Sequence, residues 1–341
     1  MRVAICGGGL VGLTLGRLLA LHGHDAVILE RMTPGKFVPR GFMLGHHGFG
    51  AVQELGLLDD LQARGRAIGT QPDGTPAAIA VAVGWLLHQL ADGAPARYGV
   101  SVNGLVHDDT GRVTGVQIDG DGGSEVVAAD LVVACDGRNS RVRQMAGLTA
   151  EVVTTAEGKI EWMSDVPSPV SFAMAYMSNG GHIGLLSWPE GSFGWRSTDP
   201  VGREAALAPG RDALIASWER LLPEAADAVR GVRSMDEVFY DQPQLLRCPQ
   251  WWTPGVVLIG DAAHFFGPET GASAGVGMAD AHALAQAITA HRGDPDAACA
   301  TYETWRAPAI RPLEAMDPSR ARCDPATIAP AAAQERWPPP D

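Results

Sequence analysis

The first thirty residues alternate between short apolar runs and a leucine-rich segment with helical spacing. A β-branched apolar run at 2–6 precedes a glycine cluster, and the leucines that follow end at Gly23. A second apolar run at 26–29 ends in Glu30. This order predicts a strand, a helix and a strand over residues 2–30. Because crossovers between parallel strands are right-handed, the unit indicates a parallel sheet.

Further along, the pattern predicts more elements of the same α/β core. Amphipathic spacing over 46–64 and over 85–90 predicts helices, and 100–133 has the glycine and aspartate turns of β-hairpins. The segments 131–135 and 256–259 are apolar at every position, as expected for buried parallel strands. An Ala-rich helix is expected over 275–291.

The middle of the chain has a different pattern of apolar and polar residues. Residues 150–250 contain strand-like pieces at 170–177 and 182–188, separated by Ser, Gly and Pro breaks, and a helix near 213–222. We predict an α/β domain at 1–70, 85–150 and 250–325, and an inserted antiparallel-sheet domain, which binds substrate, at 71–84 and 151–249. The tail at 326–341 has linker composition and is expected to be loosely held.

Net charge and cysteine content limit which partners the protein can bind and in which cellular compartment it is expected. The formal net charge of −13 argues against nucleic acid and anionic membranes as partners. The five cysteines are odd in number and far apart, unlike a disulfide framework or a zinc site. The start lacks a signal-peptide pattern, and no apolar run approaches the ~20 residues of a membrane span. We therefore expect a cytoplasmic protein without a membrane span or a metal.

The glycine cluster Gly7-Gly8-Gly9-Leu10-Val11-Gly12 lies between the first predicted strand and helix. In that context a G-x-G-x-x-G sequence binds the pyrophosphate of a dinucleotide at the helix N-terminus. Glu30 ends the next strand, where a carboxylate accepts hydrogen bonds from ribose hydroxyls and repels a 2′-phosphate. FAD or NAD is therefore favoured over NADP at this site. The expected contacts are Gly7, Gly9, Leu10, Val11, Gly12, Glu30 and Arg31.

Two further motifs each follow a buried strand. Asp261, in Gly260-Asp261-Ala262-Ala263-His264, is placed to accept hydrogen bonds from ligand hydroxyls. The segment after it leads into a helix whose positive end would favour a reduced flavin, and this selects FAD over NAD. The contacts expected there are Pro268, Gly271, Ala272 and Ser273. In the other motif, at 135–143, Asp136 and the arginines suit ribose and pyrophosphate.

Together the three motifs resemble the para-hydroxybenzoate hydroxylase family of FAD-dependent monooxygenases. The resemblance covers nearly the whole chain and implies a Rossmann-like FAD-binding domain with an inserted antiparallel-sheet substrate domain. It also implies one FAD, with NAD(P)H as a transient reductant that has no Rossmann domain of its own. The expected reaction is hydroxylation or epoxidation by dioxygen of a small, largely apolar organic substrate, aromatic or polyketide-like.

The chain departs from the family pattern at the flavin edge. Ser273 and Gly275 stand where the family has Gly and Asn, and Val83 and Gly84 stand where it tends to have an Arg. These departures leave open an FAD-linked reductase or dehydrogenase, or a flavin-fold binding protein without turnover. A halogenase is disfavoured because the chain has no W-x-W-x-x-P sequence.

The sequence names no catalytic base. His46, His47, Tyr176 and His182 are the candidates considered.

Overall fold

The protein is built around a six-stranded, mostly parallel sheet. The computed structural model describes residues 1–33, 40–177, 181–267 and 271–315. The strands lie in the order β18 (Trp252–Thr253), β19 (Val256–Leu258), β10 (Leu131–Ala134), β1 (Arg2–Cys6), β2 (Asp25–Glu30) and β6 (Ala96–Tyr98). All neighbours pair in parallel except β18 and β19. The predicted βαβ unit over 2–30 is therefore confirmed.

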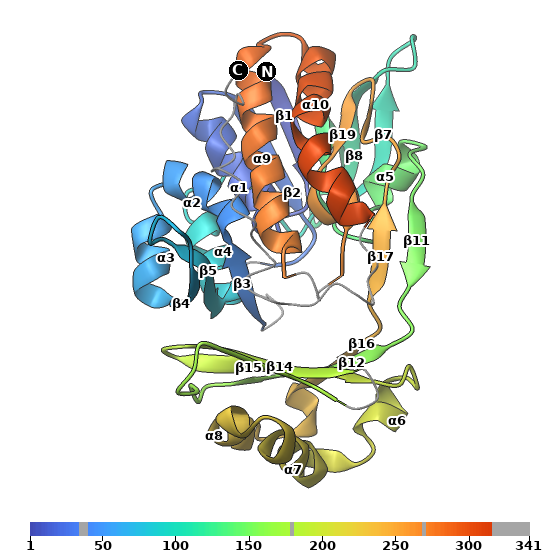
Figure 1. Ribbon diagram of the computed structural model, residues 1–341. Coiled ribbons are helices and arrows are strands. Elements are labelled where there is room, and N and C mark those ends of the chain that lie inside the picture. The colour runs from blue at the N-terminus through green and yellow to red at the C-terminus, as the bar shows by residue number, and fades with distance from the viewer. Residues whose placement is uncertain (34–39, 178–180, 268–270, 316–341) are drawn as a thin grey trace.

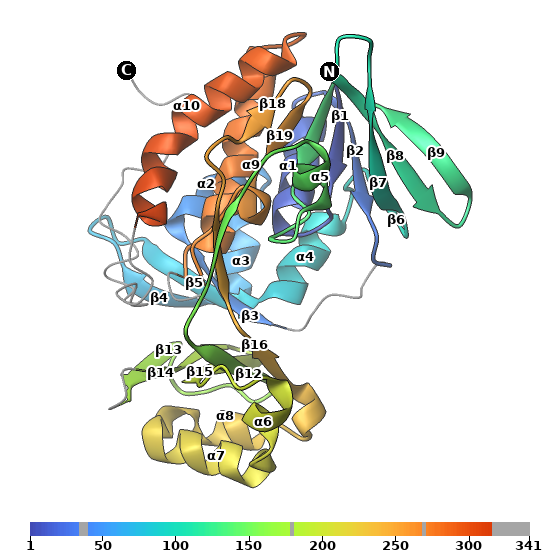
Figure 2. The ribbon, with the colours of Figure 1, turned by 90° about the vertical axis from the view of Figure 1, so that its right-hand side faces the viewer.

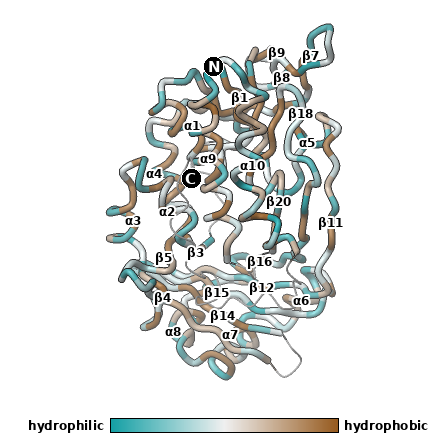
Figure 3. The backbone as a smooth tube through the Cα atoms, turned by 45° about the horizontal axis from the view of Figure 1, so that its top comes forward, coloured by the Kyte–Doolittle hydropathy of each residue, from teal (hydrophilic) through white to brown (hydrophobic). Residues whose placement is uncertain are grey.

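Helices cover one face of this sheet and a second sheet covers the other (Figures 1 and 2). The helices are α1 (Leu10–Leu21), α4 (Val83–Ala91), α9 (Ser273–Ala290) and α10 (Pro295–Glu314). The opposite face carries the meander β7 (Ser101–His107), β8 (Val113–Gly120) and β9 (Gly123–Ala128), with α5 (Arg141–Met145) beside it. Figure 3 shows hydrophobic positions along β1, α1 and α9, which share one buried core.

A small antiparallel sheet lies beside these helices. It consists of β3 (Gly41–Gly45), β5 (Pro76–Ala82) and β4 (Arg66–Thr70). The chain between β3 and β4 forms η1 (His46–Gly48), α2 (Phe49–Glu54) and α3 (Leu58–Arg64). The single helix predicted over 46–64 is thus wrong, because Gly56 adopts a positive φ of 71° and breaks it.

The inserted domain is a five-stranded antiparallel sheet. Its strands lie in the order β13 (Phe172–Tyr176), β14 (His182–Trp188), β15 (Gly191–Thr198), β12 (Gly158–Ser164) and β16 (Val238–Asp241). One face packs on the helices α6 (Arg203–Leu207), α7 (Gly210–Leu221), η2 (Pro223–Ala225) and α8 (Ala226–Arg230). Trp162 of β12 meets Trp218 of α7 edge to face at 5.7 Å in this core. The helix η3 (Met235–Glu237) precedes β16.

A narrow ribbon of extended chain joins the two parts. It consists of β11 (Glu151–Thr154), β17 (Gln244–Arg247) and β20 (His264–Phe265), and η4 (Gly260–Ala262) lies between β19 and β20. These elements complete the predicted fold class, an α/β Rossmann-like domain with an inserted antiparallel sheet, which is confirmed. The domain boundaries given above stay a prediction.

Segment 71–84 is paired differently from the expectation. It was assigned to the substrate-binding sheet, but β5 pairs with β3 and β4. It meets the five-stranded sheet through side chains only, in a buried cluster that includes Ala80, Trp188 and Trp195. The apolar run of β5 is buried between two sheets, and a sequence pattern cannot tell which of them supplies the hydrogen bonds.

A buried ion network ties the C-terminal helices to η4. The Asp280 carboxylate of α9 is fully buried and accepts hydrogen bonds from Arg306 Nε at 2.7 Å and Gly260 N at 3.0 Å, while His264 Nε2 lies 2.7 Å away. Burial alone would raise the pKa of Asp280. The charges and hydrogen bonds of His264 and Arg306 outweigh it and hold this pKa below its usual range.

We predict that Arg306→Met strongly destabilises the protein, because it leaves Asp280 buried beside one partner fewer. Loss of one member of a buried pair typically removes about 3–5 kcal/mol of unfolding free energy. Urea unfolding followed by circular dichroism measures it. The matched control is Arg230→Met, which removes an exposed guanidinium paired with Glu219 and Asp227 and should change stability by less than about 1 kcal/mol. Equal losses in the two variants would contradict a structural role for the network.

Candidate functional site

The chain between β1 and the first turn of α1 requires glycine at residues 7 and 12. Gly7 has a φ of 116°, and a Cβ there would lie 2.5 Å from the carbonyl oxygen of Cys135, the residue after β10. A Cβ at Gly12 would collide with the carbonyl oxygen of Gly7. These glycines therefore allow α1 to start directly at the carboxyl edge of the sheet.

The N-terminus of α1 is open to a ligand. Gly9, its N-cap, supplies no side chain, and a Cβ at Gly9 would meet no atom within 4 Å. The first backbone hydrogen bond of the helix runs from Leu13 N to Gly9 O at 3.0 Å, so the earlier amides stay available. Amides and helix dipole together make an anion site here.

Glu30 lies beside this turn as predicted. Its carboxylate accepts hydrogen bonds from Gly8 N at 2.6 Å and from Met32 N at 2.7 Å. Each oxygen keeps further lone pairs for ribose hydroxyls. Arg31 follows on the surface.

The Asp136 segment has two functions in the structure. One carboxylate oxygen, Oδ2, accepts hydrogen bonds from Arg141 N at 2.8 Å and Val142 N at 3.3 Å at the start of α5. The other, Oδ1, is buried and accepts no hydrogen bond from the described part of the chain. The turn therefore leaves one acceptor for a ligand.

Two arginines of this segment contact protein groups. Arg143 is buried and donates to the carbonyl oxygens of Ala262 at 2.8 Å and Arg138 at 2.9 Å. Arg138 lies over the Phe265 ring and 3.5 Å from Asp241 of the inserted sheet. Arg143 therefore joins two motifs and Arg138 joins two domains, and the expectation that the arginines of this segment suit ribose and pyrophosphate stays a prediction.

Asp261 lies on η4, between β19 and β20, and is partly buried. No hydrogen bond joins its carboxylate to any residue that the structure describes. Burial raises the pKa of Asp261 to about 6, against the opposing charges of His264 and Arg138. An acceptor of this kind at the carboxyl edge of the sheet suits ligand hydroxyls.

The N-terminus of α9 is the second open helix end. Its N-cap, Ala272, has no side chain that could cap the helix, and the Ser273 hydroxyl is buried without a hydrogen-bond partner in the described chain. Gly271 has a φ of 60°. Pro268, also expected here, lies outside the described residues.

Val11 brings the first and second motifs together. A Cβ at Gly277 of α9 would lie 2.7 Å from Val11 Cγ2, and one at Gly260 would lie 3.1 Å from it. The α1 turn, η4 and the first turns of α9 therefore meet in one place.

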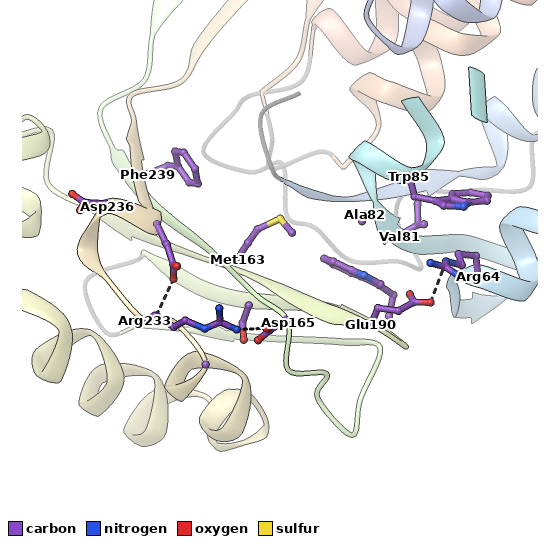
Figure 4. A pocket seen from close by; sticks show the side chains of 14 residues that line it. Arg64, Val81, Ala82, Trp85, Met163, Asp165, Glu190, Arg233, Asp236 and Phe239 are labelled. Carbon is purple, nitrogen blue, oxygen red and sulfur yellow. Dashed lines mark hydrogen bonds and ion pairs between the residues drawn. The ribbon is translucent and has the colours of Figure 1, made fainter. Parts of the chain in front are cut away.

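A cavity of about 550 Å³ lies between the small sheet and the inserted sheet (Figure 4). Its apolar walls come from Val81, Ala82 and Trp85 on one side and Met163, Trp188 and Phe239 on the other. Ion pairs border it: Arg64 with Glu190 at 3.1 Å, and Arg233 with Asp165. None of these side chains is among the site residues expected from the sequence, although the alternation along 158–164 indicates one face of a strand.

The candidate bases do not line this cavity. His46 and His47 lie in η1 with ring centroids 4.1 Å apart. His182 Nδ1 lies 2.9 Å from the Ser197 hydroxyl, and Tyr176 is half exposed on the outer strand β13.

Gly275 is explained by packing. Its φ is not positive, and a Cβ there would lie 3.3 Å from Gly45 O and 3.5 Å from Gly48 N. The glycine lets α9 approach β3 and η1 closely. At Gly84, by contrast, a Cβ would meet no atom within 4 Å.

Comparisons with known proteins agree with this geometry. The FAD binding domain family matches residues 1–77 and 85–316. The 6-methylpretetramide 4-monooxygenase of Streptomyces rimosus is 28% identical over 294 residues, which cover 78% of this chain and 70% of that protein. The 3-amino-4-hydroxybenzoate 2-monooxygenase of Streptomyces cremeus is 27% identical over 341 residues, covering 90% and 84%.

A solved structure shows the same fold. PqsL, described as a probable FAD-dependent monooxygenase from Pseudomonas aeruginosa, superposes with a TM-score of 0.81 at 20% identity, covering 96% of this chain and 98% of that one. In the described part of this chain, no helix is long and apolar enough to cross a membrane.

We predict that Gly275→Asn lowers the unfolding free energy by about 1–3 kcal/mol, because the new side chain meets tightly packed backbone. Gly84→Asn is the matched control. It enters open space on α4 and should change stability by less than about 0.5 kcal/mol. Urea unfolding of both variants is the measurement. A stable Gly275→Asn protein would show that packing does not require glycine there.

Proposed function

Because the chain belongs to the FAD binding domain family and is an FAD-dependent monooxygenase of the para-hydroxybenzoate hydroxylase type, we propose that it oxygenates a small aromatic or polyketide-like compound in the cavity between its two sheets. The carrying observation is that both domains supply apolar walls to this cavity. The reductase and the inactive binding protein are not favoured, since the relatives are monooxygenases.

The described residues fit FAD. The N-termini of α1 and α9 have no side-chain cap, and the buried oxygens Asp136 Oδ1 and Ser273 Oγ accept no hydrogen bond from the described residues. We propose that the α1 turn, from Gly7 to Gly12, holds the pyrophosphate, and that Glu30 holds the adenosine ribose. Asp261 would accept from the ribityl hydroxyls, and the α9 N-terminus would face the flavin ring.

When bound, FAD supplies the redox chemistry, taking electrons from NAD(P)H and activating dioxygen. The chain's own residues bind and orient the substrate. Trp85 and Trp188 offer flat apolar surfaces to a ring, and Met163 and Phe239 exclude water from the same space. The positive end of α9 stabilises negative charge on a reduced ring.

We predict that Met163→Trp raises the KM for the substrate more than tenfold while FAD content stays unchanged, because the larger ring fills the cavity. The assay is NAD(P)H oxidation and oxygen uptake stimulated by a panel of aromatic and polyketide-like compounds. Val126→Trp, on the exposed strand β9, is the control and should behave as wild type. A wild-type KM in Met163→Trp would place the substrate elsewhere. Absence of stimulation by every compound would contradict the proposed substrate class.

We also predict that Asp261→Asn weakens FAD binding more than tenfold at pH 8, the loss of about 1.5–3 kcal/mol expected for hydrogen bonds to a charged group. Flavin fluorescence during titration of the apoprotein measures the Kd. Asp227→Asn, exposed on α8, is the control. Unchanged FAD affinity in Asp261→Asn would exclude Asp261 as a ligand.

The pH dependence gives the same prediction a second readout. The carboxylate is the better acceptor, and the pKa of Asp261 is raised to about 6 without ligand. FAD affinity should therefore be full above that pH and fall as the pH drops through it. Asp261→Asn should remove this fall. An identical pH profile in the variant would assign the titration to another group.

A further inference from the structure

Alternate side chains of β12 point toward the α/β domain. Ile160 and Trp162 point to the helices on the other side, so Lys159, Glu161 and Met163 share the facing side. Met163 lines the cavity, and so does Phe239, which lies directly opposite Glu161 in β16. Glu161 is not itself among the residues that line the cavity, but its cross-strand partner Phe239 and its same-face neighbour Met163 both are.

Glu161 is a buried carboxylate with unused acceptor capacity. Its side chain is only 8% exposed. Oε2 lies 3.0 Å from Arg40 Nη2 but is not aligned for a hydrogen bond, and it accepts none from the described residues. A buried carboxylate oxygen without a donor is unfavourable, and a ligand that brings a donor would relieve it.

Charged groups surround Glu161 on both sides of the domain junction. Arg40 comes from the start of the small sheet, Lys159 from the same strand, Asp241 from β16 and Arg138 from the α/β domain. Lys159 pairs across the sheet with Ser197 of β15. The Ser197 hydroxyl contacts His182 of β14, and His182 pairs with Tyr176 of β13, so the row crosses four strands.

Burial is the largest influence on Glu161 and raises its pKa, while Arg40 and Lys159 act against it. The carboxylate is therefore a stronger proton acceptor than an exposed glutamate.

We propose that Glu161 anchors the substrate: it accepts a hydrogen bond from a hydroxyl or amino group on the aromatic ring and takes the proton of a phenol. This inference rests on the proposed function. In the proton transfer, the phenol O–H bond breaks and the proton moves to a carboxylate oxygen of Glu161. The electron pair stays on the phenolate oxygen and is delocalised to the ortho and para carbons, which become more nucleophilic toward an electrophilic oxygen.

A substrate preference follows from this geometry. A phenol donates a hydrogen bond to Glu161 Oε2, whereas its methyl ether brings no donor and leaves that buried oxygen without a hydrogen bond. Sites built to hydrogen-bond a hydroxyl reject analogues that lack it more strongly than apolar pockets reject a size change. The chain should therefore prefer phenols or arylamines over their methylated or unsubstituted counterparts.

The test uses matched pairs: 4-nitrophenol with 4-nitroanisole, and 2-naphthol with 2-methoxynaphthalene. Stimulated NAD(P)H oxidation is measured in FAD-loaded wild type, Glu161→Gln and the control Glu151→Gln, an exposed carboxylate paired with Arg247. We expect wild type and control to prefer the phenol at least tenfold in kcat/KM, and Glu161→Gln to lose most of that preference. Equal use of phenol and ether by wild type, or an unchanged preference in Glu161→Gln, overturns the anchor and leaves the proposed function intact.

A second variant keeps the test decisive if Glu161→Gln does not fold, as judged by FAD content and circular dichroism. The phenol kcat/KM should rise with pH as Glu161 ionises. Arg40→Gln removes a neighbouring cation and should move this rise to higher pH while the phenol preference stays. If the pH dependence of the phenol kcat/KM is unchanged in Arg40→Gln, or if this variant loses the preference for phenols, the proposal is contradicted. If no compound of either kind stimulates wild type, the proposed function itself is wrong, and the anchor with it.

Discussion

The buried carboxylate of Asp280 is the constraint on which the rest of the site depends. A charge without solvent is tolerated only where donors surround it, and here they come from three separate parts of the chain: Arg306 on α10, His264 on β20 and the Gly260 amide. Because Gly260 begins η4, the same carboxylate fixes where Asp261 can lie. The ion network therefore sets the position of a binding residue without touching the ligand.

The first motif could be predicted from the sequence because its residues are close together in the chain. Gly7, Gly12 and Glu30 lie within one short βαβ unit, so their relation is fixed by a turn and a strand pairing. The Asp261 and Asp136 segments were readable for the same reason, since each directly follows a buried strand. The sequence predicts those parts of the candidate site whose residues lie close together in the chain, in a turn directly after a strand.

The remainder depends on contacts between distant residues. The helix α10 was not predicted, because Pro308 and Pro312 lie inside it and prolines normally end helices; packing of Tyr302, Arg306 and Ile310 in the core outweighs them. Arg143 and Gly275 have ordinary sequence contexts, and only tertiary structure shows that one joins two motifs and the other permits a close helix approach. The cavity walls come from two sheets whose facing sides no local pattern relates.

The position of Val11 between Gly260 and Gly277 has a consequence for how the chain acquires its site. The turn that begins at residue 7 can be completed only by segments made some 250 residues later, as the numbering of these glycines shows. Loop closure over such a separation is slow, and an N-terminal βαβ unit must wait on the ribosome with its apolar face exposed until the last helices emerge. The surroundings of Val11 are therefore complete only once α9 has been synthesised.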